Sequence, residues 1–169
     1  MDRFGLIHDK LDIKLLILFV LRKLPDFVDE NTLSELVINA GEIGYFDYND
    51  CLSELLDTGH IEKSGSKYRI TEKGEKNVSV VESSLPFSIR QKMERELNPV
   101  AMALERGNMV RAFHAQDNGG CTVSLSLSDG VGNVLSMDLL VPDEETAFHI
   151  EEVFRQDAED IYQKIISLF

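Results

Sequence analysis

Cysteine is scarce in this sequence, and so are long hydrophobic runs. The two cysteines, Cys51 and Cys121, both fall on the apolar faces of predicted elements. We interpret them as two buried thiols rather than as a disulfide or a metal pair, which suits a reducing cytosol. The one run that suggests a membrane, Leu15 to Leu21, is far shorter than the ~20 residues of a spanning helix. No small-residue cleavage site follows it, so it matches a signal peptide poorly, and we expect a cytoplasmic protein.

Basic residues are also few relative to acidic ones. The chain carries 17 Lys and Arg against 30 Asp and Glu, for a formal net charge of -13. Such a chain repels polyanions on average, so any nucleic-acid binding must use a locally basic surface. Residues 1–77 hold ten basic and fifteen acidic side chains, and residues 78–169 hold seven and fifteen, so neither half is basic overall.

The chain lacks the residue patterns of a catalytic or metal site. No metal-ligand spacing relates its four histidines, which are His8, His60, His114 and His149. His149 shares a predicted helix face with Glu145 and Glu152, and we interpret it as a surface histidine near carboxylates rather than as a ligand. The segment Gly130-x-Gly132 leads from one strand into another, so it is a hairpin turn and not a phosphate loop. With no nucleophile–base pattern either, we expect neither an enzyme nor a cofactor.

The stretch from Tyr45 to Lys76 begins with the pattern of a short amphipathic helix, which we call the third helix. Asp47 or Asn49 is expected to cap its start, and Gly59 stands where the residue after its C-cap should lie. Its apolar residues recur at the three-and-four spacing of one helical face and are Tyr48, Cys51, Leu52, Leu55 and Leu56. The third helix is therefore expected to bury one face against a core.

A strand–turn–strand pattern follows the third helix. The segments 60–63 and 67–70 flank Ser64-Gly65-Ser66, in which glycine supplies the turn. Thr71 can cap the helix that comes next. A helix, a two-stranded hairpin and another helix form the second half of a winged helix-turn-helix, with the hairpin as the wing.

The segment before the third helix supplies the first half of that fold. Residues 9–24 form a strong helix that is apolar around most of its circumference, so it should be buried on a second side, by a partner subunit or by the C-terminal half. Phe27-Val28 has the length of the strand that pairs with a wing. Thr32 and Glu35 have the spacing of a capping box, which predicts a helix from about Leu33 to Gly41. This order of elements is that of a winged helix.

The remaining sequence predicts a helical connector and then a second sheet. A helix runs from Phe87 to about Glu105, and Asn98-Pro99 is expected to kink or split it. Alternating apolar residues predict strands at 109–116, 121–128 and 135–141, and a helix from Asp143 covers their apolar face. The fold class is therefore α+β. The predicted domains are 1–82, a winged helix; 83–106, a helical connector; and 107–169, a three-stranded antiparallel sheet plus a C-terminal helix, or βββα unit.

The predicted C-terminal helix has an apolar stripe that should lie on the sheet. The stripe consists of Ala147, Ile150, Phe154, Ala158, Ile161, Ile165 and Phe169, with Phe148 and Tyr162 widening it. The opposite, polar face of the sheet carries Thr122, Ser124, Ser126, Ser128, Ser136 and Asp138. That face is either solvated, which is the usual state of an antiparallel sheet, or an effector or dimer surface.

Several motifs carry a resemblance to known families. Tyr68-x-Ile70-Thr71-x-x-Gly74, after a charged hairpin, resembles the wing-to-helix junction of bacterial winged-helix regulators such as the PadR and MarR families. The segments 9–18, Tyr45-Phe46-Asp47 and Leu85-Pro86-x-x-Ile89-Arg90 together resemble an uncharacterised bacterial winged-helix family, a domain of unknown function. That resemblance covers essentially the whole chain. It implies a winged-helix fold and a transcriptional regulator, and it brings no ligand or DNA site.

In a DNA-binding interpretation the third helix enters the major groove and the wing contacts phosphate or the minor groove. The candidate contacts are Asn49, Ser53, Lys63, Lys67 and Arg69. The same helix exposes three carboxylates, those of Asp50, Glu54 and Asp57, at positions where phosphates would lie. One such carboxylate can accept from cytosine, but three repel the backbone. The wing itself is either a phosphate contact or a solvated charged hairpin.

The leading hypothesis is a DNA-binding transcriptional regulator that acts on double-stranded DNA as a homodimer with two-fold symmetry. The alternative is a protein-interaction module that keeps the fold without DNA binding, which the acidic third helix and the net charge of -13 favour. Neither hypothesis includes a membrane, and no small-molecule effector is assigned.

Overall fold

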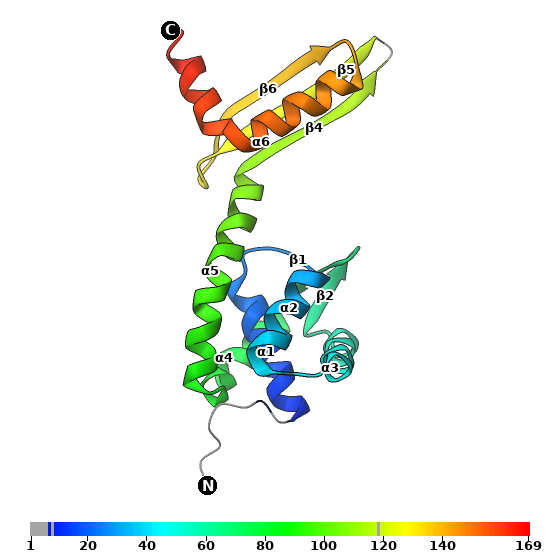
Figure 1. The fold of residues 1–169 in the computed structure, drawn as a ribbon, viewed down its shortest axis with the longest axis vertical. Helices are drawn as coiled ribbons and strands as arrows, with labels where there is room; N and C mark the ends of the chain where they lie inside the picture. Colours follow the sequence, from blue (N-terminus) through cyan, green and yellow to red (C-terminus); the bar gives the residue numbers. More distant parts are fainter. Residues whose placement is uncertain (1–6, 8, 118) are drawn as a thin grey trace. The chain divides into compact units, whose positions relative to one another are not determined.

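The structure is a computed structural model that describes residues 7, 9–117 and 119–169 (Figure 1). This part of the chain forms six α-helices and two three-stranded antiparallel sheets, a mixed α+β fold as expected. The chain divides into two compact units, Met1–Leu104 and Glu105–Phe169. Each unit has its own hydrophobic core and is described by itself. The three-part domain division stays a prediction.

The first unit contains most of the helices. Its elements are α1 (Lys10–Lys23), β1 (Val28–Asp29), α2 (Glu30–Gly41), α3 (Tyr45–Asp57), β2 (Ile61–Ser64), β3 (Lys67–Ile70), α4 (Glu72–Val81), the 3-10 turn η1 (Glu82–Ser84) and the larger part of α5 (Phe87–Met109). The sheet order is β1-β3-β2, so the short strand β1 pairs with the second strand of the β2–β3 hairpin. The sequence predicts this strand at Phe27-Val28, and the structure has it one residue later, at Val28–Asp29.

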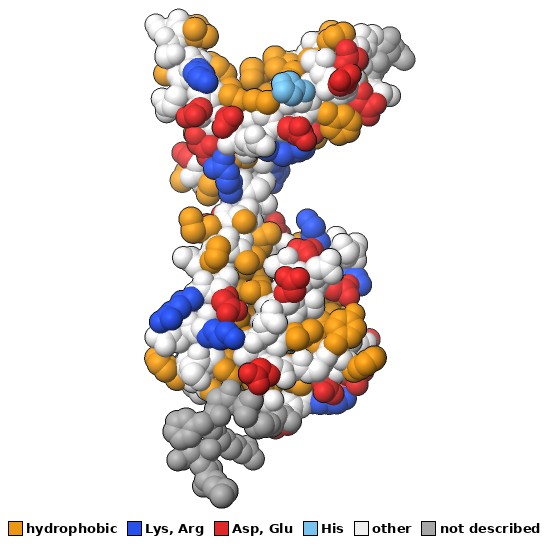
Figure 2. Space-filling view, viewed as in Figure 1, with side chains coloured by type: hydrophobic (Ala, Val, Ile, Leu, Met, Phe, Trp, Pro, Cys, Tyr) orange, Lys and Arg blue, Asp and Glu red, His pale blue; other side chains and the backbone are white. Residues whose placement is uncertain are grey.

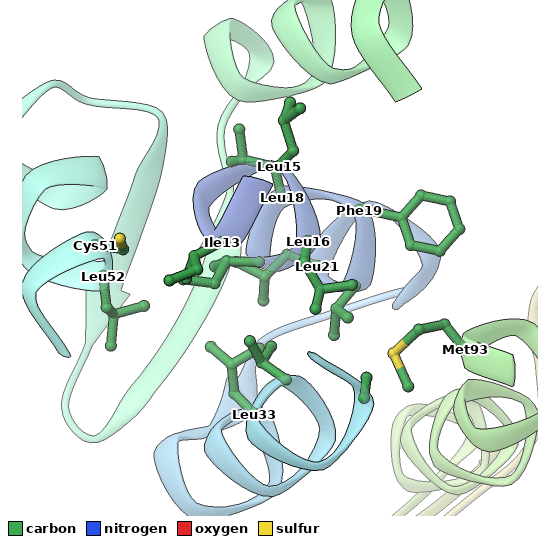
Figure 3. Close-up of a cluster of buried hydrophobic side chains, with 14 of the residues drawn as sticks. Ile13, Leu15, Leu16, Leu18, Phe19, Leu21, Leu33, Cys51, Leu52 and Met93 are labelled. Carbon is green, nitrogen blue, oxygen red and sulfur yellow. The ribbon is translucent and has the colours of Figure 1, made fainter. Parts of the chain in front are cut away.

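Helix α1 lies at the centre of this unit. Its residues Leu16, Ile17 and Phe19 are fully buried, as an all-round apolar helix predicts. Figure 3 shows Leu33 of α2 and Met93 of α5 on the side of α1 that carries Leu16 and Leu21. The expectation that a partner subunit or the C-terminal half covers its second side was wrong, because residues of the same unit bury that side.

Helix α2 begins earlier than the sequence pattern predicts. The carboxylate of Asp29 accepts from the Thr32 backbone N–H at 2.9 Å and from the Thr32 hydroxyl at 2.7 Å. Asp29 is therefore the N-cap, the helix begins at Glu30, and the predicted capping box at Thr32 and Glu35 was wrong. The hydrogen bonds from Thr32 also hold the pKa of Asp29 below its usual range. The end of the helix at Gly41 is confirmed.

Two other helix predictions need correction. Helix α3 begins at Tyr45, and its N-cap, Gly44, has no side chain to accept a hydrogen bond. Asp47 and Asn49 therefore lie inside the helix and do not cap it. Helix α5 continues as one helix from Phe87 to Met109 with Pro99 inside it, so Asn98-Pro99 does not split it.

The second unit has the predicted βββα order. Its elements are β4 (Val110–Asp117), β5 (Gly120–Ser128), β6 (Asn133–Val141) and α6 (Glu144–Ile166), with sheet order β4-β5-β6. Asp143 caps α6 by accepting from the Thr146 N–H at 2.8 Å. Phe154 and Ala158 of α6 are buried on Val123 and Leu125 of β5, which forms the second core.

The apolar stripe of α6 is only partly buried. The α6 backbone is kinked at Asp157 (φ −123°, ψ 27°), and Figure 1 shows the last turns of the helix, in red, leaving the line of the first ones. Phe169, predicted as the end of the stripe, lies beyond the helix and is fully exposed. Phe148, predicted to widen the stripe, has half of its surface exposed and packs edge-on against the ring of His114.

No helix in the described part of the chain combines the length and apolar composition needed to cross a membrane. Cys51 is buried in the first core and Cys121 in the second, so the predicted burial of both thiols is confirmed. Burial raises the pKa of the Cys51 thiol.

Candidate nucleic-acid interface

The third helix, α3, presents one face to the core and one to solvent. Tyr48, Cys51 and Leu55 are buried, as their spacing predicts. The opposite face therefore exposes Ser53, while Asn49 beside it is half-buried. The two candidate base-contacting residues thus lie on one side of α3, four positions apart.

A glycine ends α3 and turns the chain toward the hairpin. Gly59 adopts φ +72°, a conformation that favours residues without a Cβ. Its N–H donates to the Leu56 carbonyl at 3.0 Å, and the next N–H, from His60, donates to the Leu55 carbonyl at 2.9 Å. This pair of bonds is a Schellman motif, which confirms the predicted role of Gly59.

The junction between the hairpin and α4 explains the spacing of Tyr68-x-Ile70-Thr71-x-x-Gly74. Tyr68 and Ile70 are buried on the inner side of β3. The Thr71 hydroxyl donates to the Gly59 carbonyl at 2.7 Å and accepts from the Gly74 N–H at 3.3 Å. A Cβ on Gly74 would lie 2.2 Å from the His60 carbonyl oxygen, so only glycine lets α4 approach this closely. These hydrogen bonds and this close packing hold the end of α3 against the start of α4.

The hairpin places its cations on the exposed side. Ser64 pairs with Lys67 across a two-residue turn whose Gly65 has φ +60°. Because side chains alternate along a strand, Lys67 and Arg69 share the exposed face while Tyr68 points inward. The shared face of Lys67 and Arg69 is the one that the sequence predicts, whereas the turn is shorter than predicted because Ser64 belongs to β2.

Two of the three hairpin cations have partners within the unit. Arg69 donates to the Glu62 carboxylate at 2.9 and 2.5 Å, and its guanidinium lies 4.5 Å from the Phe27 ring centre. Lys63 lies 3.8 Å from a Glu30 oxygen. Among the described residues, no ion pair or hydrogen bond engages the ammonium of Lys67. Lys67 is therefore the hairpin cation most available to a phosphate.

The carboxylates of α3 are partly neutralised by α1. Lys10 lies 3.5 Å from both Asp50 and Glu54, and Lys14 forms a close ion pair with Glu54. The hydrogen bond from Lys14 lowers the pKa of Glu54, and the bond to Asp50 raises the pKa of Lys10. Asp57, the third carboxylate, is exposed. Part of the repulsion that the sequence predicts is therefore offset by two cations beside α3.

Sequence reasoning missed Lys10 and Lys14 as part of this surface. Their four-residue spacing on a mostly apolar helix places both ammonium groups on one side, and this spacing can be recognised in the sequence. The identity of the element that they face depends on how α1 packs against α3, which the spacing alone does not supply.

The start of α3 exposes two aromatic rings that sequence reasoning also missed. Tyr45 is 58% exposed and Phe46 is 83% exposed. Their ring centres lie 6.2 Å apart in an edge-to-face arrangement. Figure 2 shows hydrophobic side chains at the surface over α3. Exposed aromatic residues at one helix end are typical of contacts with another protein.

Two of the four histidines, His60 and His114, have hydrogen-bond partners within the described residues. His60 hydrogen-bonds to Thr58 at 2.7 Å and to Asn77 at 2.6 Å, and burial lowers its pKa. His114 hydrogen-bonds to Glu151 at 2.6 Å, and His8 lies outside the described residues. The described residues include no group of three metal-ligating side chains, at His149 or elsewhere.

The order of elements in the two compact α+β units defines the fold class of this protein. It does not define a functional class. The chain belongs to the family described as a domain of unknown function (DUF4364), whose model matches residues 13–169. This agrees with the expected uncharacterised family, and the description names neither a winged helix nor PadR or MarR regulators. The comparison with curated proteins found no match, and the comparison with solved structures found none either.

Proposed function

We propose that the first unit is a winged helix and that the chain is a DNA-binding transcriptional regulator. The observation that carries the proposal is the order α2, turn, α3 and hairpin, with β1 completing the small sheet. In winged-helix proteins the helix in the position of α3 enters the major groove, and the hairpin contacts the DNA backbone.

The charges around α3 support a specific mode of contact. Lys10 and Lys14 offset the carboxylates of Asp50 and Glu54. In this mode Ser53 and Asn49 contact base edges and Lys67 contacts a phosphate, with Lys63 and Arg69 exchanging their internal partners for phosphates. The contact to phosphate supplies affinity for any sequence, and the contacts to bases supply preference.

Fluorescence anisotropy with random-sequence and native upstream duplexes, between about 50 and 200 mM salt, tests the proposal. We expect Lys67→Glu to weaken binding to both duplexes and to lower the salt slope by about one. Lys164→Glu is the matched control, because it makes the same charge change at an exposed position of α6. Asn49→Ala should instead change the preference between duplexes. Equal affinities for Lys67→Glu and Lys164→Glu would remove the hairpin from the interface.

A second candidate, a protein-interaction module, is favoured by the exposed rings of Tyr45 and Phe46. It is also supported by the internal partners of Lys63 and Arg69. Folded protein that binds no duplex even at low salt would favour this candidate. Phe46→Ala should then reduce co-purification with protein partners, whereas Phe87→Ala, which removes another exposed ring from the same unit, should not.

A further inference from the structure

Strand β6 forms an edge of the second sheet and is less covered than its neighbour. On the inner face Leu135, Met137 and Leu139 of β6 are half-buried, whereas the residues opposite them on β5 are buried. A cavity of about 280 Å³ lies beside Met137 and Leu139, with Ile150 and Val153 of α6 on its other side. The α6 helix therefore leaves the inner face of β6 partly open.

The two edges of this sheet differ in how they are protected. On β4 the Arg155 guanidinium donates to the backbone carbonyl of Ala112 at 2.6 Å. Strand β6 spans nine residues, Asn133–Val141, without proline, lysine or arginine. Its one charged residue, Asp138, accepts from the Ser124 hydroxyl at 2.6 Å. Natural edge strands are usually blunted by proline, cations, β-bulges or a covering segment. The pairing of β6 with β5 shifts register only at its Asn133 end, so the regular run Leu135–Val141 remains an open apolar edge that can pair with another strand.

We propose that two copies of the chain associate through β6, which pairs antiparallel with β6 of the second copy about a two-fold axis at Met137. The pairing joins the two sheets into one. It is argued from the second unit alone, so it goes beyond the proposed DNA binding and does not depend on it.

The sequence of β6 is complementary to itself in this register. Val134 faces Leu140 of the second copy on the outer side of the sheet, and Leu135 faces Leu139 on the inner side. Asp138 faces the Ser136 hydroxyl, so no like charges oppose each other. Both copies contribute the same patch, as a two-fold interface requires.

Neighbouring registers are less favourable. An axis at Asp138 places two carboxylates directly opposite each other, which destabilises a cross-strand pair. An axis at Ser136 leaves Leu140 and Val141 of each strand without partners in β6, whereas an axis at Met137 sets the first residue of the strand, Asn133, opposite the last, Val141. Self-complementarity over a full strand identifies the occupant of the edge as a second copy rather than an unrelated peptide.

A pair of double variants tests both the interface and its register in the full-length chain. Val134 and Leu140 are 40% and 73% exposed, so their substitution leaves the core intact. V134K/L140K sets lysine opposite lysine at two places in the dimer, whereas V134K/L140E sets lysine opposite glutamate at both. By sedimentation equilibrium we expect the first variant to raise the dimer dissociation constant by about tenfold to a hundredfold. We expect the second to remain dimeric.

Three outcomes would overturn the proposal. They are a monomeric wild type, an unchanged dimer in V134K/L140K, and equal loss of dimer in both variants. Far-UV circular dichroism of each variant separates loss of association from loss of folding. DNA binding by a protein that is monomeric would leave the proposed function standing while the β6 interface fails.

Cross-linking supplies an independent measure of the register. Met137→Cys places a thiol against its own copy at the axis, so oxidation should yield a covalent dimer on a non-reducing gel. Val134→Cys alone should not cross-link, whereas V134C/L140C should. The natural thiols Cys51 and Cys121 are buried and contribute little background. Cross-linking of Val134→Cys as complete as that of Met137→Cys would show the register to be wrong.

Discussion

At the scale of single residues, Glu151 is a buried charged side chain whose environment can be traced atom by atom. It is 4% exposed, and its two carboxylate oxygens lie 2.6 Å from His114 Nδ1 and 2.8 Å from the Arg155 guanidinium. Burial by itself raises the pKa of Glu151, but the hydrogen bonds from His114 and Arg155 outweigh it and hold the pKa below its usual range. The ionised carboxylate therefore stabilises the second unit.

A glutamine at this position should make the stability of the second unit less dependent on pH. The folded pKa of Glu151 is lowered, so its contribution is complete above the unfolded pKa of about 4.3 and is lost as pH falls through the folded pKa. We expect Glu151→Gln to cost about 2 kcal/mol at neutral pH and progressively less in acid. Urea unfolding at several pH values measures this, and Glu152→Gln, at an exposed neighbour, is the control. A pH-independent difference would contradict the assignment.

The stability of the first unit also depends on Gly74, because a single added Cβ atom would clash there. An added Cβ would meet the His60 carbonyl oxygen at 2.2 Å, and this backbone oxygen cannot rotate away. Gly74→Ala should destabilise the first unit by about 1–3 kcal/mol despite the better helix propensity of alanine. Gly107→Ala, in the part of α5 that belongs to the second unit, is the control for an alanine in a helix without a clash, because nothing lies within 4 Å of its added Cβ. Thermal unfolding of the two variants should shift in opposite directions.

At the scale of elements, the helix starts show where the local sequence pattern predicts the structure and where it does not. Asp9, Thr71 and Asp143 each accept a backbone N–H three residues along, and of these caps only the one at Thr71 was predicted from the sequence. The start of α2 differs because Asp29, the last residue of β1, also serves as the cap. A residue with a role in two elements is difficult to recognise from the local pattern of either one.

The cap of α2 can be assigned by substitution. Asp29→Ala removes the acceptor for the Thr32 N–H and hydroxyl, so it should destabilise the first unit by about 1 kcal/mol. Thr32→Ala removes only one donor and should cost less than half as much. Chemical unfolding of both variants at neutral pH distinguishes them. A larger loss from Thr32→Ala would restore the predicted capping box.

At the scale of the whole molecule, each of the two compact units has a core of its own. The first core includes Leu16 of α1, which is fully buried, and the second includes Phe154 of α6, which is 1% exposed. No residue is shared between the two cores as they are assigned in the described part of the chain. The cores can therefore be weakened separately.

Core truncations should act within the unit that contains them. Leu16→Ala should cost about 2–5 kcal/mol and Phe154→Ala about 3–5 kcal/mol, because each leaves a cavity in a packed core. In hydrogen exchange followed by mass spectrometry, we expect Leu16→Ala to speed exchange in α1–α4 while β4–β6 stay protected. Phe154→Ala should give the reverse pattern. Equal acceleration in both units from either variant would show that they unfold as one.

Much of the fold could be predicted from the periodicity of the apolar residues. The buried face of α3, the glycine after it, the hairpin and the βββα order all follow from residue spacing, because each is set by local geometry. Less of the candidate site could be predicted from the sequence. Asn49 and Ser53 were placed on one side of α3, but the pairing of Lys10 with Asp50 and of Arg69 with Glu62 depends on side-chain contacts between elements. Such contacts decide which charges remain available to a ligand.

The close contact at Gly74 also limits which sequences can share this fold. Every residue other than glycine carries a Cβ, and the backbone carbonyl of His60 leaves no room for one. Gly65 also has a positive φ, but nothing lies within 4 Å of an added Cβ there, so asparagine is a tolerable substitute. Among relatives that keep the junction, we therefore expect glycine at position 74 without exception and variation at position 65. Position 74 then becomes a fixed point for aligning distant members of the family.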